Sequence, residues 1–273
     1  MPDRCLPSNL FNRENLIAIM NKAESFLSKY TRTESGSRLS FDAVGELGVL
    51  YNKLLMSATV GGNPEWIAYI LATVQWETAS TFKPVKEAFW LSEEWRKANL
   101  RYYPYYGRGY VQLTWETNYR KMSDALGLPI VEHPDIALKP KHAYDIMVTG
   151  MLSGMFTGQA LRERRDNEDL FGYFLICRQI INGNDRKYEV AEIAVDMLEC
   201  MGNQINLYND LPMVRDVSDY KKTSEFVLHE VLLPKLGFES IKDYQSSKDL
   251  IVDGICGDRT WSAIVSDIHS GQQ

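Results

Sequence analysis

One glutamate in this sequence continues the apolar stripe of an expected helix instead of facing water. The stripe recurs at spacings of three, four and three residues and consists of Ile67, Ile70, Val74 and Glu77. Burial and the negative end of the helix dipole would both disfavour the ionised carboxylate of Glu77 and raise its pKa. A carboxyl group that keeps its proton near neutral pH can act as a general acid. Taken alone, the pattern favours a structural glutamate that bonds to backbone or pairs with an arginine.

A second glutamate, Glu87, follows ten residues later in different surroundings. Lys83 and Lys86 are close in sequence, and positive neighbours favour an ionised carboxylate. A protonated and an ionised carboxyl group facing one sugar bond can hydrolyse it, and a separation of roughly 6.5–9.5 Å leaves room for the attacking water. Glu93 and Glu94 compete for the base role, but their place in an expected first helical turn favours capping.

The segment YYGRGYVQLTWETNY at residues 105–119 carries the strongest signal. Gly107 and Gly109 flank Arg108, which predicts a tight turn with close approach of the backbone to its surroundings. Several aromatic rings surround this turn, and the faces of tyrosine and tryptophan suit the apolar faces of pyranose rings.

Three polar side chains after the turn are expected on one side of the chain. If residues 110–113 are extended, Gln112 and Thr114 alternate onto the same face. Thr114 is then expected to cap a helix that ends at Gly127, with Asn118 one turn along on the same side. Amide and hydroxyl groups bind sugar hydroxyls, although a helix cap is the simpler interpretation of Thr114 alone.

Helices must position these residues, because apolar residues recur at helical spacing along most of the chain. The expected helices cover residues 16–30, 43–56, 65–80, a short stretch after Ser92, 115–127, 141–157, 169–181 and 187–207, with N-caps at Asn12, Ser40, Asn63, Ser92 and Thr114. Strands are expected at most in short segments at 109–113 and 249–255. The sequence therefore predicts a mainly α-helical fold.

Composition excludes several classes of function. The 273 residues carry a net charge of −6, which implies no general affinity for nucleic acid or acidic membranes. The basic run at 162–165 is offset by Asp166, Glu168 and Asp169. No apolar run approaches the roughly 18 residues of a membrane span, and no secretory signal is visible. The scattered cysteines predict buried free thiols, with no metal site and no cofactor; they are Cys5, Cys177, Cys200 and Cys256.

The segment at 105–119 resembles glycoside hydrolase family 19, the plant-type chitinases and related phage endolysins, whose segment reads YYGRGxxQLTxxxNY. QWETAS supplies Glu77 where the family has His-Glu-Thr or His-Glu-Ser, and PVKEAF supplies Glu87 at the spacing of the endolysin branch. RQIINGN supplies Arg178 and Asn182 where the family has Arg-x-Ile-Asn-Gly, with one extra residue. These matches agree in order along the chain.

The resemblance implies a lysozyme-like α-helical domain and an inverting β-1,4-glycosidase. It makes Glu77 the general acid and Glu87 the general base, while Thr114 helps to position the attacking water. It further implies substrate contacts from Tyr106, Arg108, Gln112, Asn118, Arg178 and Asn182. One departure is Trp76, which replaces the family histidine, so we expect altered tuning of Glu77 and not loss of activity.

The C-terminal segment resembles the small helical peptidoglycan-binding module. Gly237-Phe238, Asp253-Gly254, Gly257 and Thr260 fit its pattern, whereas Cys256 replaces the usual aromatic residue. The alternative is an ordinary Asp-Gly turn. The expected organisation is an N-terminal helical region packed on the catalytic domain, the catalytic domain, a linker and a wall-binding module, at residues 1–62, 63–208, 209–221 and 222–273.

Peptidoglycan is the expected substrate, because the glutamate spacing and the tail both resemble those of endolysins. Chitin oligomers are the alternative polymer. A lytic transglycosylase, which needs one acidic glutamate and no base, and a non-catalytic wall-binding protein are further alternatives. We expect a monomer, made in the cytoplasm, that reaches the wall after holin-type release or delivery.

Overall fold

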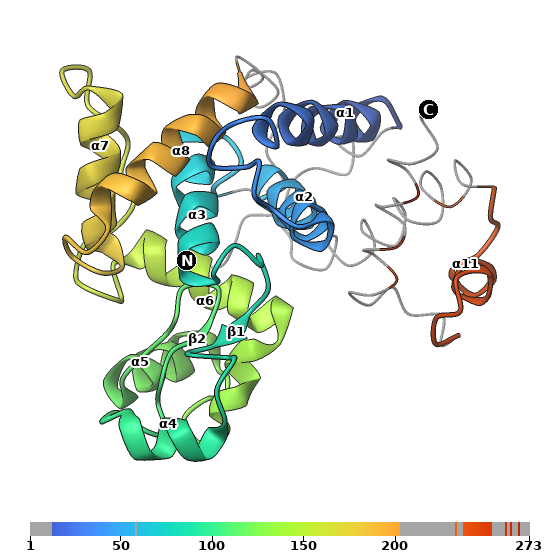
Figure 1. The fold of residues 1–273 in the computed structure, drawn as a ribbon. Helices are drawn as coiled ribbons and strands as arrows, with labels where there is room; N and C mark the ends of the chain where they lie inside the picture. Colours follow the sequence, from blue (N-terminus) through green and yellow to red (C-terminus); the bar gives the residue numbers. More distant parts are fainter. Residues whose placement is uncertain are drawn as a thin grey trace. The chain divides into compact units, whose positions relative to one another are not determined.

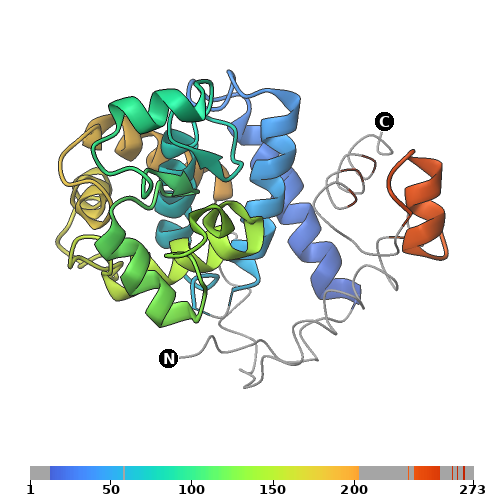
Figure 2. The ribbon, with the colours of Figure 1, turned by 90° about the horizontal axis from the view of Figure 1, so that it is seen from below.

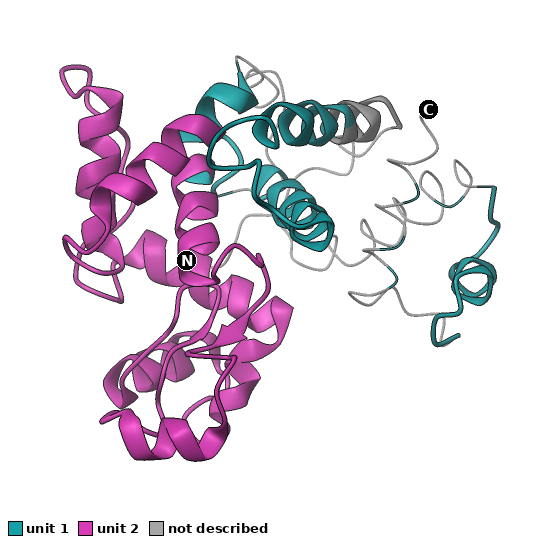
Figure 3. Cartoon of the chain, in the orientation of Figure 1, with its two compact units in different colours: residues 1–67, 198–273 teal, residues 68–197 magenta. Residues whose placement is uncertain are grey.

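The structure is a computed structural model that describes residues 13–57, 59–202, 233, 237–252, 260, 263 and 267, and these are mostly helical (Figures 1 and 2). The chain divides into two compact units, residues 1–67 with 198–273 and residues 68–197 (Figure 3). In the described ranges, no helix is both long and apolar enough to cross a membrane.

The first unit contains two helices that pack against each other, α1 (Arg13–Tyr30) and α2 (Phe41–Leu55). Their contact includes the rings of Phe26 and Tyr51, whose centroids are 4.4 Å apart. The Ser40 hydroxyl accepts a hydrogen bond of 3.2 Å from the backbone N–H three residues later, which confirms the expected N-cap of α2.

The second unit contains residues 68–77 of helix α3 (Pro64–Glu77). Residues 67–72 of this helix are almost completely inaccessible to water, as expected for a helix that is apolar on nearly all sides. The other helical elements are α4 (Glu93–Asn99), α5 (Glu116–Leu126), η2 (Pro134–Leu138), α6 (Pro140–Ser153), α7 (Leu170–Cys177), η3 (Arg178–Ile180) and α8 (Lys187–Met201).

A two-stranded antiparallel sheet joins parts of the second unit that are distant in sequence. Strand β1 (Val85–Lys86) pairs with β2 (Arg108–Gly109), so that Val85 lies opposite Gly109. Beside it, α5, α6 and η2 surround a core of buried side chains. These are Leu113, Tyr119, Met122, Ile130, Ala137 and Ile146.

The C-terminal part is described around α11 (Ile241–Ser247). Gln245 and Thr260 are both buried and share a hydrogen bond of 3.0 Å between their side chains, so this part has buried polar contacts of its own. The wall-binding module expected at 222–273 stays a prediction, and Asp253-Gly254 and Cys256 lie outside the described residues.

The mainly α-helical prediction is confirmed for the described residues, and the predicted strands are corrected. Of the strand expected at 109–113, only Gly109 belongs to a strand, the two-residue β2, and the chain turns at Gln112, where φ is +52°. Residues 249–252 are not a strand. The Asn12 cap and the linker at 209–221 lie outside the described part of the chain.

The N-cap of α3 gives a test of the local fold. Asn63 Oδ1 accepts a hydrogen bond of 3.1 Å from the N–H of Trp66, and Pro64 occupies the first helical position, where proline is favoured. We expect Asn63→Ala to lower the free energy of unfolding by about 1 kcal/mol, and Asn63→Asp to keep most of it. Urea denaturation measures both, and an unchanged midpoint in Asn63→Ala would show that the side chain does not cap the helix.

Candidate functional site

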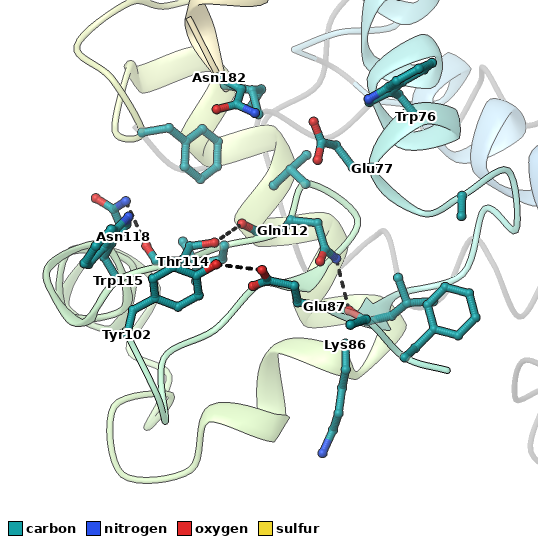
Figure 4. A pocket seen from close by; sticks show the side chains of 18 of the residues that line it. Trp76, Glu77, Lys86, Glu87, Tyr102, Gln112, Thr114, Trp115, Asn118 and Asn182 are labelled. Atoms are coloured by element: carbon teal, nitrogen blue, oxygen red, sulfur yellow. Dashed lines mark hydrogen bonds between the residues drawn. The ribbon is translucent and has the colours of Figure 1, made fainter. Parts of the chain in front are cut away.

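A pocket of about 600 Å³ in the second unit brings together most of the predicted site residues (Figure 4). Its lining includes two carboxyl groups, the hydroxyl group of a threonine and three amides, which belong to Glu77, Glu87, Thr114, Gln112, Asn118 and Asn182. They come from the end of α3, the residue after β1, the turn after β2, α5 and the segment after η3. The two glutamates therefore share one compartment, as the sequence predicts.

Glu77 is the last residue of α3, and its side chain is 13% exposed. Arg178 is completely buried behind it, with Nη1 2.8 Å from Glu77 Oε1. The two groups are not aligned as a hydrogen bond, so the contact is an ion pair. Arg178 Nε also donates a hydrogen bond of 2.8 Å to the backbone carbonyl of Asp185, which fixes the guanidinium.

Two opposing influences set the proton affinity of Glu77. Burial raises its pKa, the charge of Arg178 lowers it, and the net result is a pKa above that of an ordinary glutamate. The predicted direction is confirmed. The simpler structural interpretation, a glutamate paired with an arginine, is confirmed as well, because Glu77 has both a raised pKa and an ion pair with Arg178.

Glu87 has different partners. Its Oε1 accepts a hydrogen bond of 2.6 Å from the Tyr102 hydroxyl, and its Oε2 accepts one of 2.9 Å from the N–H of Gly107. The expected lysine neighbour is wrong for Lys86, whose side chain extends away from Glu87 (Figure 4). Its Nζ lies 2.8 Å from Asp135 Oδ2. Successive residues of an extended chain point to opposite sides, which separates Lys86 from Glu87.

Gly107 allows the close approach that the sequence predicts. A Cβ atom at this position would lie 2.7 Å from Gln112 Oε1 and 3.2 Å from Glu87 Oε2. Any side chain here would therefore displace two groups that line the pocket.

Tyr106 and Arg108 lie behind the pocket instead of lining it, which corrects their predicted contact with substrate. Tyr106 is completely buried, and the Arg108 guanidinium lies 3.7 Å from the centroid of its ring. Arg108 donates hydrogen bonds to the carbonyl of Pro104 (2.8 Å), to the hydroxyl of Tyr119 (3.1 Å) and to Asp135 Oδ1 (2.8 Å). These two residues hold the turn, and Arg178 likewise acts from behind through Glu77.

The turn after β2 presents Gln112 and Thr114 to the pocket. Gln112 Nε2 donates to the carbonyls of Val85 and Gly109, each at 3.1 Å. The Thr114 hydroxyl donates to the Gln112 carbonyl at 2.7 Å, so Thr114 is not the N-cap of α5. Trp115 occupies that position without a side-chain cap, and Asn118 Nδ2 donates to the Thr114 carbonyl at 3.0 Å.

Backbone strain is concentrated in this pocket. Four residues that line it have left-handed backbone angles, at φ values of +51°, +48°, +52° and +74°, and these are Ala79, Ala88, Gln112 and Trp115. Each such conformation costs of order 1–3 kcal/mol for a residue other than glycine. Strain of this kind persists where the surrounding structure enforces it, and it is typical of functional sites.

The pocket is also lined by aromatic side chains for which the sequence predicts no individual contact with substrate. Trp76, Trp90 and Trp115 are 37%, 69% and 43% exposed. The rings of Tyr102 and Trp115 meet edge to face, with centroids 4.9 Å apart. The only sequence signal for Tyr102 is its place in an aromatic-rich run, which does not separate it from the buried Tyr106.

Glu93 and Glu94 do not line the pocket. The Ser92 hydroxyl accepts a hydrogen bond of 3.2 Å from the N–H of Trp95, which confirms the predicted cap. Glu93 accepts a hydrogen bond of 3.0 Å from the hydroxyl of Tyr106, so it supports the turn at residues 106–109. Among the described residues, no group of three or more His, Cys, Asp or Glu side chains could hold a metal ion.

No protein-family model matches the chain. A segment of 33 residues is 58% identical to "Chitinase 11" of rice, Oryza sativa subsp. japonica, and covers 12% of this chain and 13% of that protein. Chitinase C from Streptomyces griseus is similar in structure over 67% of this chain and 75% of its own, at 18% identity and a TM-score of 0.40. A bacterial family 19 chitinase matches with the same identity and TM-score over 93% of its chain. Similarity at this level establishes no shared activity.

The environment of Glu77 predicts its titration. In a ¹³C NMR titration we expect its carboxyl group to have a pKa above that of an ordinary glutamate, because burial outweighs the charge of Arg178. Arg178→Gln removes the charge that favours the ionised form, so the pKa of Glu77 should rise further. A downward shift in this variant would contradict the assignment.

The hydrogen bonds of Arg108 are expected to contribute to the free energy of unfolding. Arg108→Lys keeps the charge but cannot reproduce the fork of donors, and we expect the free energy of unfolding to fall by on the order of 3 kcal/mol. Arg120→Lys on α5 is the control, because Arg120 is exposed and pairs with Glu116 on the surface. An equal change in the free energy of unfolding in the two variants would show that the buried hydrogen bonds of Arg108 do not stabilise the protein.

Proposed function

We propose that this protein is an inverting glycosidase that hydrolyses β-1,4 bonds between N-acetylhexosamines of bacterial peptidoglycan. The observation that carries the proposal is the presence of Glu77 and Glu87 in one pocket with unlike surroundings. Glu77 is buried and has a raised pKa, whereas both oxygens of Glu87 act as hydrogen-bond acceptors. This pairing suits general acid and general base catalysis across a sugar bond.

In the proposed reaction, protonated Glu77 gives its proton to the glycosidic oxygen as the bond from this oxygen to the anomeric carbon breaks. A water molecule attacks the anomeric carbon from the opposite face and gives its proton to Glu87. The products are two shorter glycans, and the new reducing end has inverted configuration. Glu87 then releases its proton to solvent and Glu77 takes one up, which restores both groups for the next cycle.

Thr114 is suited to orient the attacking water. Its own hydroxyl proton is directed to the Gln112 carbonyl, so Oγ1 is left as an acceptor. A water that donates one proton to Glu87 and the other to Thr114 has its lone pairs free for the anomeric carbon. This role depends on the left-handed turn at Gln112, which sets the direction of that carbonyl.

The rest of the lining suits sugar rings. The amides of Asn118 and Asn182 can hydrogen-bond hydroxyl and acetamido groups, and the exposed rings of Trp76 and Trp90 can cover apolar faces of pyranoses. Trp76 thus has a place in the pocket although it stands where the resembling family has histidine.

Peptidoglycan is preferred because the spacing of the two glutamates and the C-terminal segment resemble those of endolysins, and we propose action on the wall after release from the cytoplasm. Chitin is the second candidate, favoured by the short match to a rice protein named as a chitinase. Both polymers are linked by β-1,4 bonds between N-acetylhexosamines, so the same acid and base would serve either.

The test uses purified peptidoglycan and chitin oligomers with mass spectrometry of the fragments. We expect Glu77→Gln and Glu87→Gln each to lose on the order of 10²-fold or more in rate, with wall binding nearly unchanged. NMR of fresh products should show the inverted anomer. Arg120→Gln, which changes an exposed residue outside the pocket, serves as the control.

Two outcomes would overturn this mechanism. Full activity of Glu87→Gln together with 1,6-anhydro products would identify a lytic transglycosylase. Sedimentation with walls without any cleavage would identify a wall-binding protein.

A further inference from the structure

Arg101, at the edge of the pocket, differs from the nearby cations in its partner, which is an aromatic ring and not a carboxylate. The guanidinium of Arg101 lies 5.0 Å from the ring centroid of Trp115, a residue that lines the pocket. Arg101 itself is exposed to solvent, and it immediately precedes Tyr102, which holds Glu87. Its charge is therefore fixed beside the site by an aromatic contact.

The neighbouring cations are neutralised by carboxylates. Lys86 Nζ is 2.8 Å from Asp135, and Arg186, which lies 5.9 Å from the Trp76 ring, is 2.8 Å from Glu189. Arg178 is buried against Glu77. Arg101 forms no ion pair with any residue that the structure describes, so its charge is available to a ligand.

The position of Trp115 under this charge is enforced by the backbone. Trp115 has a φ of +74°, and its N–H donates to the carbonyl of Tyr105 at 2.9 Å. A strained residue held in this way indicates a conformation with a role beyond packing. Here it places the ring of Trp115 against both Tyr102 and Arg101, at the edge of the pocket.

We propose that Arg101, carried on Trp115, recognises a carboxylate of the glycan substrate and so selects peptidoglycan over chitin. This inference rests on the proposed function. Chitin is uncharged, whereas every second sugar of peptidoglycan carries a lactyl group. The lactyl group is either a free carboxylate or the attachment point of a peptide that has carboxylates of its own.

The experiment compares Arg101→Gln with the unmodified protein on three soluble glycans of equal length. These are a chitin oligomer, a peptidoglycan oligomer stripped of peptide, which has free lactyl carboxylates, and one that retains its peptides. We expect kcat/KM on a carboxylate-bearing glycan to fall about fivefold at low salt, mainly through KM. The value on chitin should not change, and the difference should shrink as salt is added.

Two further variants separate recognition from structure. Lys97→Gln on α4 removes an exposed charge that does not line the pocket, and it should behave like the unmodified protein. Arg101→Lys keeps the charge and should recover part of the loss. Calorimetric binding of the three glycans to full-length Glu77→Gln, with and without Arg101→Gln, gives the same comparison without catalysis.

Loss confined to the stripped glycan identifies the lactyl carboxylate as the ligand, and loss confined to the peptide-bearing glycan identifies the peptide. Equal loss on chitin, or no loss on either charged glycan, overturns the role of Arg101 while the glycosidase stands. Absence of cleavage of all three glycans by the unmodified protein overturns the proposed function itself.

Discussion

Burial of the Arg108 guanidinium would cost free energy if its donors found no acceptors, and the acceptors that it finds organise the site. They are backbone carbonyls, a phenol and a carboxylate. These acceptors belong to the loop before β2, to α5 and to η2, so one side chain ties together three parts of the second unit. The turn fixed in this way carries Gly107, whose N–H holds Glu87, and it leads directly to Gln112 and Thr114.

The two carboxyl groups of the pocket have different surroundings because different elements hold Glu77 and Glu87. Glu77 ends a buried helix, and only one cation opposes the effect of burial on its pKa. Glu87 directly follows the short strand β1, where a phenol and a main-chain N–H donate hydrogen bonds to its oxygens. The difference arises from the position of each residue at or directly after the end of an element, and the elements are held by residues that never reach the pocket.

Sequence patterns predicted the features that depend on local chemistry. The caps at Ser40, Asn63 and Ser92 follow from side chains that bond to nearby N–H groups, and the burial of Glu77 follows from helical spacing. The motif does not separate residues that contact substrate from residues that form the core, so it does not reveal that Tyr106 and Arg108 are buried. The left-handed angles of Gln112 and Trp115 had no signal, since neither residue type favours them. Tyr102 is likewise recognisable only once the chain is folded.

The left-handed residues around the pocket have a consequence for how the site can vary. The main chain itself forms the bends at Ala79, Ala88, Gln112 and Trp115, so it contributes to the contour of the cavity together with the side chains that line it. Rim positions such as Trp90 can then be exchanged to suit a new polymer while these bends persist. The main chain thus sets much of the shape of this cavity and the side chains set its lining, so the two can be changed separately in directed evolution.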